Sequence, residues 1–518
     1  MRRLLFFSLL VSSIGLHAQS FNRSELPTQI IGAWEVVYGP DNFLWLSEAN
    51  GQVLRVDPKT GAKQVVYAAP DYFEGSPKEQ LQACHFPNIL GGTLGLTLDP
   101  DFTEASKSFV YYVYSYNSGT TENPATKFKI VRLKWDTTTQ SITEVRNLVL
   151  DLPTSYDHIG GRLLAVKQQG VSHLFFTIGD HGISDDNAPT CYTPQSKNPN
   201  NLAQDVAFKN GKIHRFNMDG SIPSDNPTLG NSWFTRGHRN PQGLIYNAAQ
   251  NILYDVEHGD RTDDEINILE LGKNYGWKQV RGYHSDGNFP TEIDFVKNYV
   301  PDPKIPQDEL KEAMFAWCNT SFPTDPNNLT WCSVAPSDGI YYHSNTIPEW
   351  NNSLLIVTLK DGYDTDQEVY QFKLSADGKS LDKNAAQNPK RYFAADQALN
   401  GRLRDIAVSP DGKEIFLINN GGADRNKIIM YTYNTTLPIE ESPTISYHVF
   451  PNPTRGIIQI DSTQPLHKIT IFDVLGQQYL TVYHTLSVDI STLPIGVYFL
   501  KMETIFGKTI LRKVVKDH

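Results

Sequence analysis

The segment with the most polar chemistry in the fewest residues is the octapeptide at residues 237–244, Gly-His-Arg-Asn-Pro-Gln-Gly-Leu. It places the guanidinium of Arg239, the amides of Asn240 and Gln242 and the imidazole of His238 in a turn bounded by glycine and proline. Such groups offer several hydrogen-bond donors close together, which suits a polar, planar, anionic ligand. Taken alone, the octapeptide is equally compatible with a hydrogen-bonded structural turn.

Residues suited to acid–base or charge-binding chemistry recur along the chain, far apart in sequence. They form motifs at residues 157–163 (DHIGGRL), 177–182 (TIGDHG), 257–260 (EHGD), 263–267 (DDEIN), 274–277 (NYGW), 359–360 (LK) and 402–405 (RLRD), with Trp331 and residues 334–337 (VAPS) among them. His181, His214, His238 and His258 have no spacing that would aim two imidazoles at one ion. We therefore expect these four histidines to be hydrogen-bonded structural residues.

The elements that must position these motifs are short β-strands. Apolar and aromatic runs such as residues 109–114 (FVYYVY), 174–178 (LFFTI), 353–357 (SLLIV), 414–418 (EIFLI) and 428–431 (IIMY) alternate with turn signals that include Asp-Gly pairs. The best helix candidate is residues 309–315. Many short strands leave a sandwich, a barrel or a propeller, and a region of about 410 residues exceeds the usual size of the first two. We predict an all-β fold in which residues 20–432 form a six-bladed β-propeller with long loops on one face.

The composition excludes several classes of protein. The chain has 518 residues, of which 39% are hydrophobic and 20% charged, so it can build a packed core. Its formal net charge of −11 disfavours nucleic acid and anionic lipid as partners. A small or neutral partner is the expectation that follows.

The N-terminus has the pattern of an export signal. Arg2 and Arg3 precede an apolar run at residues 4–16, and Ala18 follows it. This predicts a signal peptide at residues 1–18, and the run is shorter than the ~20 apolar residues that a membrane anchor needs. The four cysteines would then reach an oxidising compartment, where Cys318 and Cys332 are the easier pair to join across their loop.

The C-terminal part changes in texture. Residues 433–446 are rich in Pro, Ser and Thr, which predicts a linker, and residues 447–518 restart with short apolar runs separated by turns, which predicts a small β-sandwich. The opening FPNPTRG and the later GVYFL resemble the C-terminal sorting domain of the type IX secretion system of the Bacteroidetes. The resemblance implies export through the periplasm by that machinery to the cell surface or medium. An ordinary carbohydrate-binding β-sandwich is the alternative.

Taken together and in this order, the motifs of the large region resemble those of the soluble, pyrroloquinoline-quinone (PQQ)-dependent glucose dehydrogenases and the wider glucose/sorbosone dehydrogenase family. The resemblance covers most of residues 85–420. It implies a six-bladed propeller that binds PQQ and calcium on its loop face and oxidises an aldose at the anomeric carbon to the lactone. An external electron acceptor is implied as a partner.

The resemblance also implies roles for single residues. His158 matches the catalytic base and Asp180 the carboxylate that orients it, an arrangement suited to taking a proton near neutral pH. Arg239 matches the group that polarises the quinone carbonyl during hydride transfer. Residues that match contacts to the cofactor are Asn240, Gln242, Lys360, Arg402, Arg404 and the aromatic wall Trp331.

The resemblance also implies calcium ligands, one of which differs in residue type from the family pattern. Gly259 and Asp260 match two positions whose backbone carbonyls coordinate the active-site calcium, although the second is proline in the family pattern. Glu265 and Tyr275 match part of a second, structural calcium site. A solvated acidic turn is the alternative for Glu265.

Two departures limit what the resemblance implies. Leu90 stands where the family has a cofactor-binding glutamine, and the loops at residues 183–203 and 286–311 differ. Such loops shape the sugar pocket and a dimer contact, so the preferred sugar and a homodimer stay open. Two other functions remain: a propeller that binds without catalysis, which the retained His158 and cationic residues disfavour, and a calcium-dependent lactonase, which needs no such cations.

Overall fold

The computed structural model describes residues 20–75, 93–155, 158–182, 202–260, 262–284, 292–317, 333–360, 367–420, 426–434, 447–462, 466–504 and 509–518. It divides the chain into one compact unit at Phe21–Tyr433 and a second that contains Asn434–His518. Helices in these ranges are limited to α2 (Glu292–Lys297), α3 (Gln397–Asn400) and the 3-10 turn η1 (Ala394–Asp396). The protein is therefore an all-β chain, and none of its described helices has the length and apolar character to cross a bilayer.

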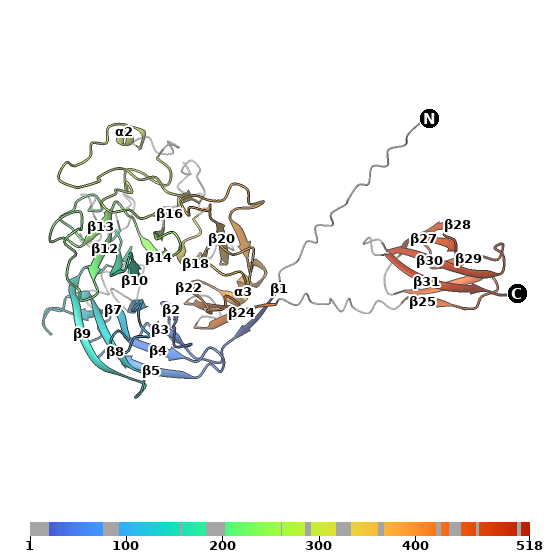
Figure 1. Cartoon of the computed structure of the whole chain (residues 1–518), viewed down its shortest axis with the longest axis horizontal. Coiled ribbons are helices and arrows are strands. Elements are labelled where there is room, and N and C mark those ends of the chain that lie inside the picture. Colours follow the sequence, from blue (N-terminus) through green and yellow to red (C-terminus); the bar gives the residue numbers. More distant parts are fainter. Residues whose placement is uncertain are drawn as a thin grey trace. The chain divides into compact units, whose positions relative to one another are not determined.

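In the described part of the first unit the strands form six four-stranded sheets (Figure 1). The first three are β2 (Glu35–Tyr38), β3 (Leu44–Glu48), β4 (Gln52–Val56) and β5 (Lys63–Ala68); β6 (Thr93–Leu98), β7 (Phe109–Asn117), β8 (Thr126–Asp136) and β9 (Ser141–Leu152); and β10 (Leu163–Gln168), β11 (Val171–Ile178), β12 (Lys212–Asn217) and β13 (Trp233–Arg236). The others are β14 (Pro241–Asn247), β15 (Ile252–Glu257), β16 (Glu265–Ile268) and β17 (Phe315–Ala316); β18 (Pro336–Tyr342), β19 (Ser353–Thr358), β20 (Val369–Lys373) and β21 (Lys390–Tyr392); and β22 (Leu403–Val408), β23 (Glu414–Asn419) and β24 (Ile428–Asn434) with β1 (Ser20–Glu25).

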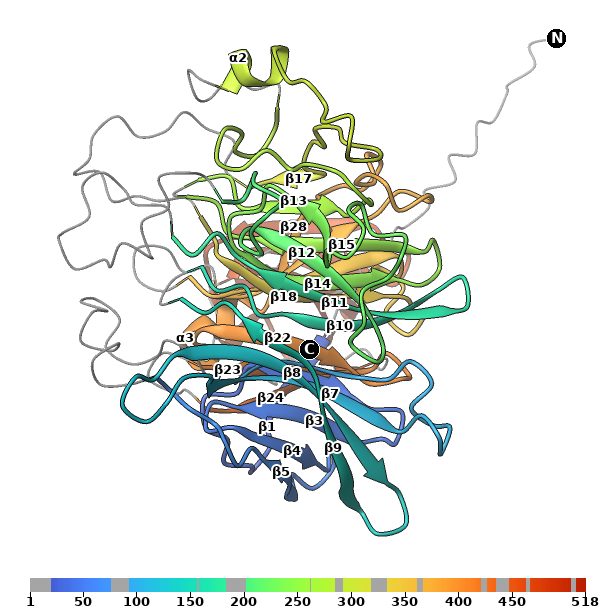
Figure 2. The ribbon, with the colours of Figure 1, turned by 90° about the vertical axis from the view of Figure 1, so that its left-hand side faces the viewer.

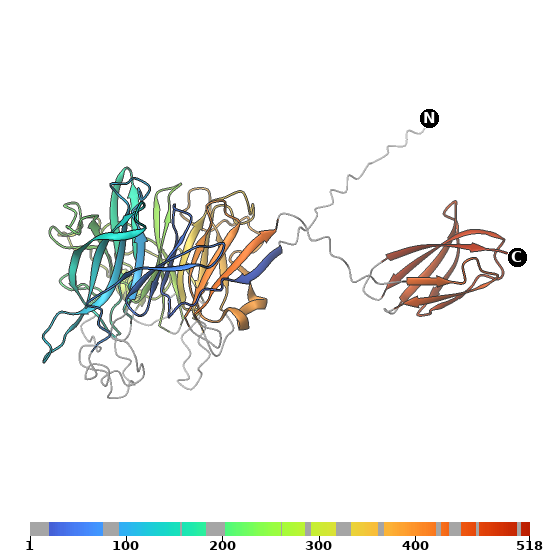
Figure 3. The ribbon, with the colours of Figure 1, turned by 90° about the horizontal axis from the view of Figure 1, so that it is seen from below.

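The first strands of the sheets form the inner wall of a ring. β2 contacts β6, β6 contacts β10, and the series continues through β14, β18 and β22, which returns to β2. The ring is closed by strands from the two ends of the unit: β1, its first strand, is the outer strand of the sheet that also holds the last three strands, β22, β23 and β24. Figure 2 shows β10, β14 and β18 in successive sheets, and in the view from below (Figure 3) the strands cross the thickness of the ring.

Burial of both faces explains the apolar sequence of the middle strands. Each sheet packs between two neighbours, so β3 and β19 are buried at every position rather than at alternate ones. Large aromatic side chains fill the wedges between sheets: the rings of Trp45 and Trp135 meet edge to face with centroids 5.1 Å apart. The packing leaves the strand ends and loops free to build a site that opens to solvent.

The helix predicted over residues 309–315 is wrong. Its backbone bonds to neighbouring segments instead: Lys311 N donates to the carbonyl of Asn274 in a loop, Met314 N donates to the carbonyl of Ile266 in β16, and Phe315 enters β17. The segment is rich in helix-forming residues, but pairing with the edge of β16 satisfies its backbone groups in an extended form. Tertiary pairing has overridden local propensity.

The second unit has two sheets that share one core. The three-stranded sheet is β25 (Tyr447–Phe450), β26 (Ile457–Ser462) and β29 (Ser487–Asp489), and the four-stranded sheet is β28 (Gln478–Tyr483), β27 (Leu466–Asp473), β30 (Gly496–Thr504) and β31 (Thr509–Lys516). Ile458 and Val488 of the first sheet belong to the same apolar cluster as Ile471 and Leu500 of the second. Residues 435–446 of the predicted linker and the four cysteines lie outside the described residues, whereas Tyr433 and Asn434 belong to β24.

Candidate active site

Strand pairing explains how distant motifs come to one end of the ring. In an antiparallel pair, the residue before the first strand and the residue after the second lie at the same end. Pro241 of β14 pairs with Glu257 of β15, and Pro336 of β18 pairs with Thr358 of β19. Arg239 and Gly259 therefore lie at the same end of the fourth sheet. Lys360 lies at the corresponding end of the fifth sheet.

His158 and Asp180 form a close pair at this end of the third sheet. His158 Nδ1 lies 2.6 Å from Asp180 Oδ1, and the side chains are 11% and 0% exposed. The contact depends on a close approach of the backbone, because a Cβ on Gly179 would lie 1.9 Å from the His158 carbonyl oxygen. The predicted base and its carboxylate are thus brought together, with His158 held at φ 46° in the left-handed region.

Asp180 is held ionised by its partners. Burial alone would raise the pKa of Asp180, but the charge and hydrogen bond of His158, the charge of Arg239 and a hydrogen bond from Trp277 hold it below its ordinary value. Trp277 Nε1 donates to Asp180 Oδ2 at 2.7 Å, and Gly182 N donates to Oδ1 at 2.9 Å. The carboxylate therefore has a fixed orientation, which in turn fixes the ring of His158.

Arg239 lies beside this pair. The Arg239 carbonyl accepts from Asp180 N at 2.8 Å, and its guanidinium carbon lies 5.5 Å from the centroid of Trp277. Trp277 thus contacts both Asp180 and Arg239. The NYGW motif is visible in the sequence, but no local signal in it predicts a role for Trp277 or reveals this contact.

The two amides of the octapeptide join three sheets. Asn240 Oδ1 accepts from Gly160 N at 3.2 Å and from Gln242 Nε2 at 2.7 Å. Gln242 Oε1 in turn accepts from Arg404 Nη2 at 3.0 Å. The chain of hydrogen bonds runs from the loop of His158 to the first residues of β22.

Several positive side chains converge on His258. Burial, followed by the charges of Arg239, Arg404 and Arg402, holds the pKa of His258 well below its ordinary value, so the ring stays neutral. Burial and the charges of Arg162 and Arg402 likewise lower the pKa of Arg404. An anion bound among these groups would relieve their mutual repulsion.

Buried donors test whether the site fits an anionic cofactor. Arg239 Nε, Arg404 Nε and His258 Nε2 are buried and have no hydrogen-bond partner among the described residues. An unsatisfied buried donor costs about 1–3 kcal/mol, which an oxygen of a bound ligand would recover. The residues present therefore fit a flat tricarboxylate such as PQQ.

The remaining residues predicted to contact the cofactor are Arg402, Lys360 and Trp331, and the structure gives fewer contacts for them. Arg402 Nη1 donates to Asn420 Oδ1 at 3.2 Å, and Lys360 is half-buried at the same end of the ring. Trp331 and Leu90 lie outside the described residues, so the predictions made for them stay predictions.

The loop of Gly259 and Asp260 is fixed by a buried carboxylate. Asp264 accepts from Gly259 N at 2.8 Å and from the backbone N–H groups of Val334 and Ala335 at 2.7 and 2.8 Å. The position requires glycine, because a Cβ on Gly259 would lie 2.0 Å from the Thr262 carbonyl oxygen. Asp264, which nothing in the sequence distinguishes from its acidic neighbours, is the residue that sets this loop.

Asp260 brings a carboxylate to the site. Its side chain, 35% exposed, pairs with Arg281 at 3.1 Å and with Arg239 at 3.7 Å. The negative group therefore competes with any bound anion for Arg239. A proline at this position would leave Arg239 without that competitor.

Glu265 and Tyr275 line one small pocket together with Arg239 and His258, but their side chains have separate partners. Glu265 accepts from Gly282 N at 2.7 Å and from Asn267 Nδ2 at 3.1 Å. The Tyr275 hydroxyl donates to the Ile268 carbonyl, away from Glu265. Their assignment to a second calcium site stays a prediction.

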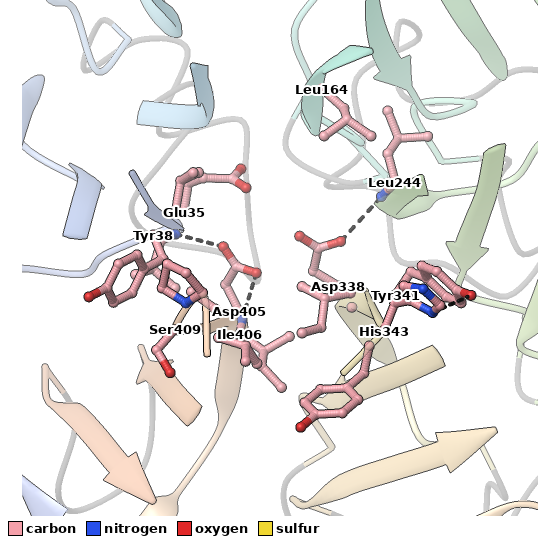
Figure 4. Close-up of a pocket in the computed structure, with 18 of the residues that line it drawn as sticks. Glu35, Tyr38, Leu164, Leu244, Asp338, Tyr341, His343, Asp405, Ile406 and Ser409 are labelled. Atoms are coloured by element: carbon pink, nitrogen blue, oxygen red, sulfur yellow. Dashed lines mark hydrogen bonds between the residues drawn. The ribbon is translucent and has the colours of Figure 1, made fainter. Parts of the chain in front are cut away.

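A buried ionic cluster lies beside the site, among residues at the first strands of four sheets. Arg162 Nη1 is 2.6 Å from Glu35, 3.1 Å from Asp338 and 3.5 Å from Asp405, and its Nε donates to the Gln242 carbonyl. A cavity of about 400 Å³ extends from this cluster along β2, β18 and β22 toward Tyr38 and the far ends of those strands. Figure 4 shows Glu35, Asp338 and Asp405 among the residues that line this cavity.

Comparison with known proteins agrees with this architecture. The sequence model of the glucose/sorbosone dehydrogenase family matches residues 31–429, and that of the secretion system C-terminal sorting domain matches residues 448–517. Quinoprotein glucose dehydrogenase B of Acinetobacter calcoaceticus is 28% identical over 460 residues, which cover 79% of this chain and 87% of that protein. Aldose sugar dehydrogenase YliI of Escherichia coli is 25% identical over 433 residues, with coverage of 81% and 95%.

Solved structures show the same fold. The PQQ-bound form of aldose sugar dehydrogenase from Streptomyces coelicolor superposes with a TM-score of 0.55 at 21% identity, covering 81% of this chain and 99% of that one. The apo-form of the soluble aldose sugar dehydrogenase from Escherichia coli gives 0.56 at 23% identity, with coverage of 80% and 100%. The chain therefore belongs to the glucose/sorbosone dehydrogenase family, with a β-propeller unit followed by a secretion-system C-terminal sorting domain.

Proposed function

We propose that this protein is a PQQ-dependent dehydrogenase that oxidises an aldose at its anomeric carbon to the lactone. The observation that carries the proposal is the His158–Asp180 pair set beside buried guanidinium groups whose Nε atoms lack described partners. The six four-stranded sheets would be the six blades of the propeller. PQQ, when bound, supplies the acceptor for the hydride that leaves the sugar.

Each residue would act through its position. His158 Nδ1 is held by Asp180, which leaves Nε2 as the atom that takes the proton of the sugar hydroxyl. Arg402, Arg404 and Lys360 would hold the carboxylates of the cofactor, and Arg239 would stabilise negative charge on its carbonyl. Asn240 and Gln242 would orient these groups through their hydrogen bonds. Trp331 would form an aromatic wall.

Calcium would bind through the backbone carbonyls of Gly259 and Asp260, because it is a hard cation that takes oxygen ligands. The loop that carries them is anchored by Asp264 and adjoins Arg239, so the cation and the positive side chains would face the same anionic ligand. Glu265 and Tyr275 would contribute to a second ion.

Export is proposed from the ends of the chain. Residues 1–18 would be removed as a signal peptide, residues 20–432 would form the enzyme and residues 433–446 a linker. Residues 447–518, as a β-sandwich sorting domain, would pass the protein to the type IX secretion machinery. The enzyme would then meet its sugar and its electron acceptor at the cell surface or in the medium.

The test is reconstitution. Purified protein is loaded with calcium and PQQ, cofactor uptake is followed by absorbance, and reduction of an artificial dye is measured with a panel of aldoses. We expect uptake and sugar-dependent dye reduction, with His158→Ala retaining uptake but losing turnover. Uptake without reduction of any aldose would overturn the activity, and absence of uptake would overturn the cofactor and favour a binding propeller.

A further inference from the structure

A second group of charged side chains is buried in the fourth sheet. Asp255 and Glu257 of β15 face Asn267 and Glu265 of β16 directly across the ladder. Because side chains two apart on a strand share one face, all four lie on the same side of the sheet. His238 covers them, with its Nδ1 3.1 Å from Glu257 and 3.7 Å from Asp255.

These side chains are among the least exposed of the protein. Asp255, Asn267 and His238 are each 0% exposed, Glu257 is 3% and Glu265 is 9%. Neither carboxylate oxygen of Asp255 has a hydrogen-bond partner among the described residues, and Asn267 Oδ1 has none there either. A buried carboxylate with two unsatisfied oxygens is costly unless a positive group balances it.

Among the described residues, this cluster has no ion pair with a permanently charged side chain. In the described ranges, the ion pairs of Asp255 and Glu257 are both with His238, and no cation pairs with Glu265. An imidazole is charged only when it is protonated, whereas a guanidinium or a metal ion carries its charge permanently. Burial, followed by the charges of Glu257 and Glu265, raises the pKa of Asp255 well above its ordinary value.

The cluster at the centre of the ring provides the comparison. There, too, three buried carboxylates meet, those of Glu35, Asp338 and Asp405, but Arg162 contacts all three. A cation is therefore built into that cluster as a side chain. The fourth sheet has the same concentration of carboxylates and holds no such side chain among the residues described.

We propose that the cluster in the fourth sheet binds a divalent cation. The ligands are the carboxylates of Asp255 and Glu257, with His238 Nδ1, and Asn267 Oδ1 lies across the strand pair. The ligand atoms of His238, Asp255 and Glu257 lie within 4.8 Å of one another, close enough to surround one ion. Carboxylate and amide oxygens with one imidazole suit a divalent ion such as Mn²⁺ or Zn²⁺.

The site is distinct from the loop of Gly259 and Asp260 and does not depend on the proposed function. Its ligands are side chains in the sheet, whereas that loop would offer backbone carbonyls to an ion beside the cofactor. Glu257 and Glu265 also line the small pocket next to Arg239 and Tyr275. The bound ion would stabilise the folded chain, because the ligand set exists only when β15 and β16 are paired.

The first test uses the full chain without PQQ. The protein is treated with EDTA, dialysed against Mn²⁺, Zn²⁺ or Ca²⁺ in turn, and its metal content is measured by mass spectrometry. Crystals of the Mn²⁺- and Zn²⁺-loaded protein are examined for anomalous scattering. We expect a peak between Asp255 and Glu257; crystals with no peak there for either ion would overturn the proposal.

Variants give a second, independent readout. Asp255→Asn keeps the shape of the side chain but removes its charge, and should bind roughly one ion fewer per chain and lose the rise in melting temperature that the ion produces. The matched control is Asp338→Asn, another buried aspartate, which should bind as many ions as the wild type. Equal metal content and equal thermal shift in Asp255→Asn and the wild type would overturn the proposal, whatever the outcome of the dehydrogenase assay.

Discussion

Replacing Asp180 by asparagine tests the core of the proposed site. Asp180 is fully buried, lies 2.6 Å from His158 Nδ1 and is kept ionised by its surroundings. Asparagine has the same shape, but it is neutral, and its amide can present N–H to the ring instead of an acceptor. The ring of His158 would then be free to adopt the wrong tautomer, with a proton on the nitrogen that faces the substrate.

The magnitude follows from the contacts that change. A hydrogen bond to a charged group contributes about 1.5–3 kcal/mol, or about 10- to 150-fold in rate at 1.36 kcal/mol for each factor of ten. The wrong tautomer adds to this loss, and removal of the orienting carboxylate from comparable pairs lowers kcat by up to about 10⁴. We therefore expect kcat of Asp180→Asn to fall by about 10² to 10⁴.

The assay is dye-linked oxidation of the best aldose by the reconstituted enzyme, with PQQ uptake measured on the same samples. Trp277→Phe is the matched control, because it removes the 2.7 Å bond to the other oxygen of Asp180 and leaves the bond to His158 in place. It should lose much less activity. His158→Ala and the double variant complete a cycle, in which the two losses should not multiply because both act on one base.

Two results would refute the reasoning. If Asp180→Asn with full cofactor uptake turned over at the wild-type rate, the carboxylate would not orient a base. If the losses in Asp180→Asn and His158→Ala multiplied in the double variant, the two residues would act separately, and their contact would be structural only.

Three further predictions concern charges around the site. Arg162→Met leaves the carboxylates of Glu35, Asp338 and Asp405 buried without their cation and should destabilise the propeller unit by about 3–5 kcal/mol in a denaturant titration; an unchanged midpoint would contradict this. Burial, only partly offset by Arg162, raises the pKa of Glu35 to about 8 from 4.5, so the folded state holds a proton that the unfolded state releases between these values. The free energy of unfolding should therefore fall as the pH rises through that window, and Glu35→Gln should flatten the profile; an equally steep profile in the variant would assign the effect to other groups. Asp260→Asn frees Arg239 from a partly exposed competitor 3.7 Å away and should tighten PQQ binding by about 2- to 5-fold in a titration of the apo-protein, with weaker binding as the contrary result.

Local patterns were sufficient for much of the fold. Runs such as residues 353–357 are apolar at every position, and the strand β19 at Ser353–Thr358 is buried throughout because sheets cover both of its faces. Residues 309–315 show the limit of such patterns. Their helix propensity is a property of the segment, whereas their pairing with β16 depends on residues 40 or more positions earlier in the chain.

For the candidate site too, some features can be read from the sequence and others only from the folded structure. The types of residue that could act, an imidazole, a carboxylate and several guanidinium groups, are readable from motifs such as DHIGGRL, GHRNPQG and RLRD, because chemical type is a local property. The pairing of Trp277 with Asp180, the anchoring of Gly259 by Asp264 and the placement of Asp260 against Arg239 are not. Each joins residues of different loops, and no spacing along the chain encodes a distance across the ring.

The sequence alone thus determined the strand content, the family pattern and the inventory of reactive side chains. The tertiary structure decided which of them meet, which charges are balanced and which are not. The contrast between the two buried acidic clusters shows why: Arg162 contacts all three carboxylates of one because it lies directly before β10, where the inner strands come together, while Asp255 is held inside the fourth sheet among further carboxylates. Burial and mutual distance set the free energy of a charge, and both are properties of the folded chain.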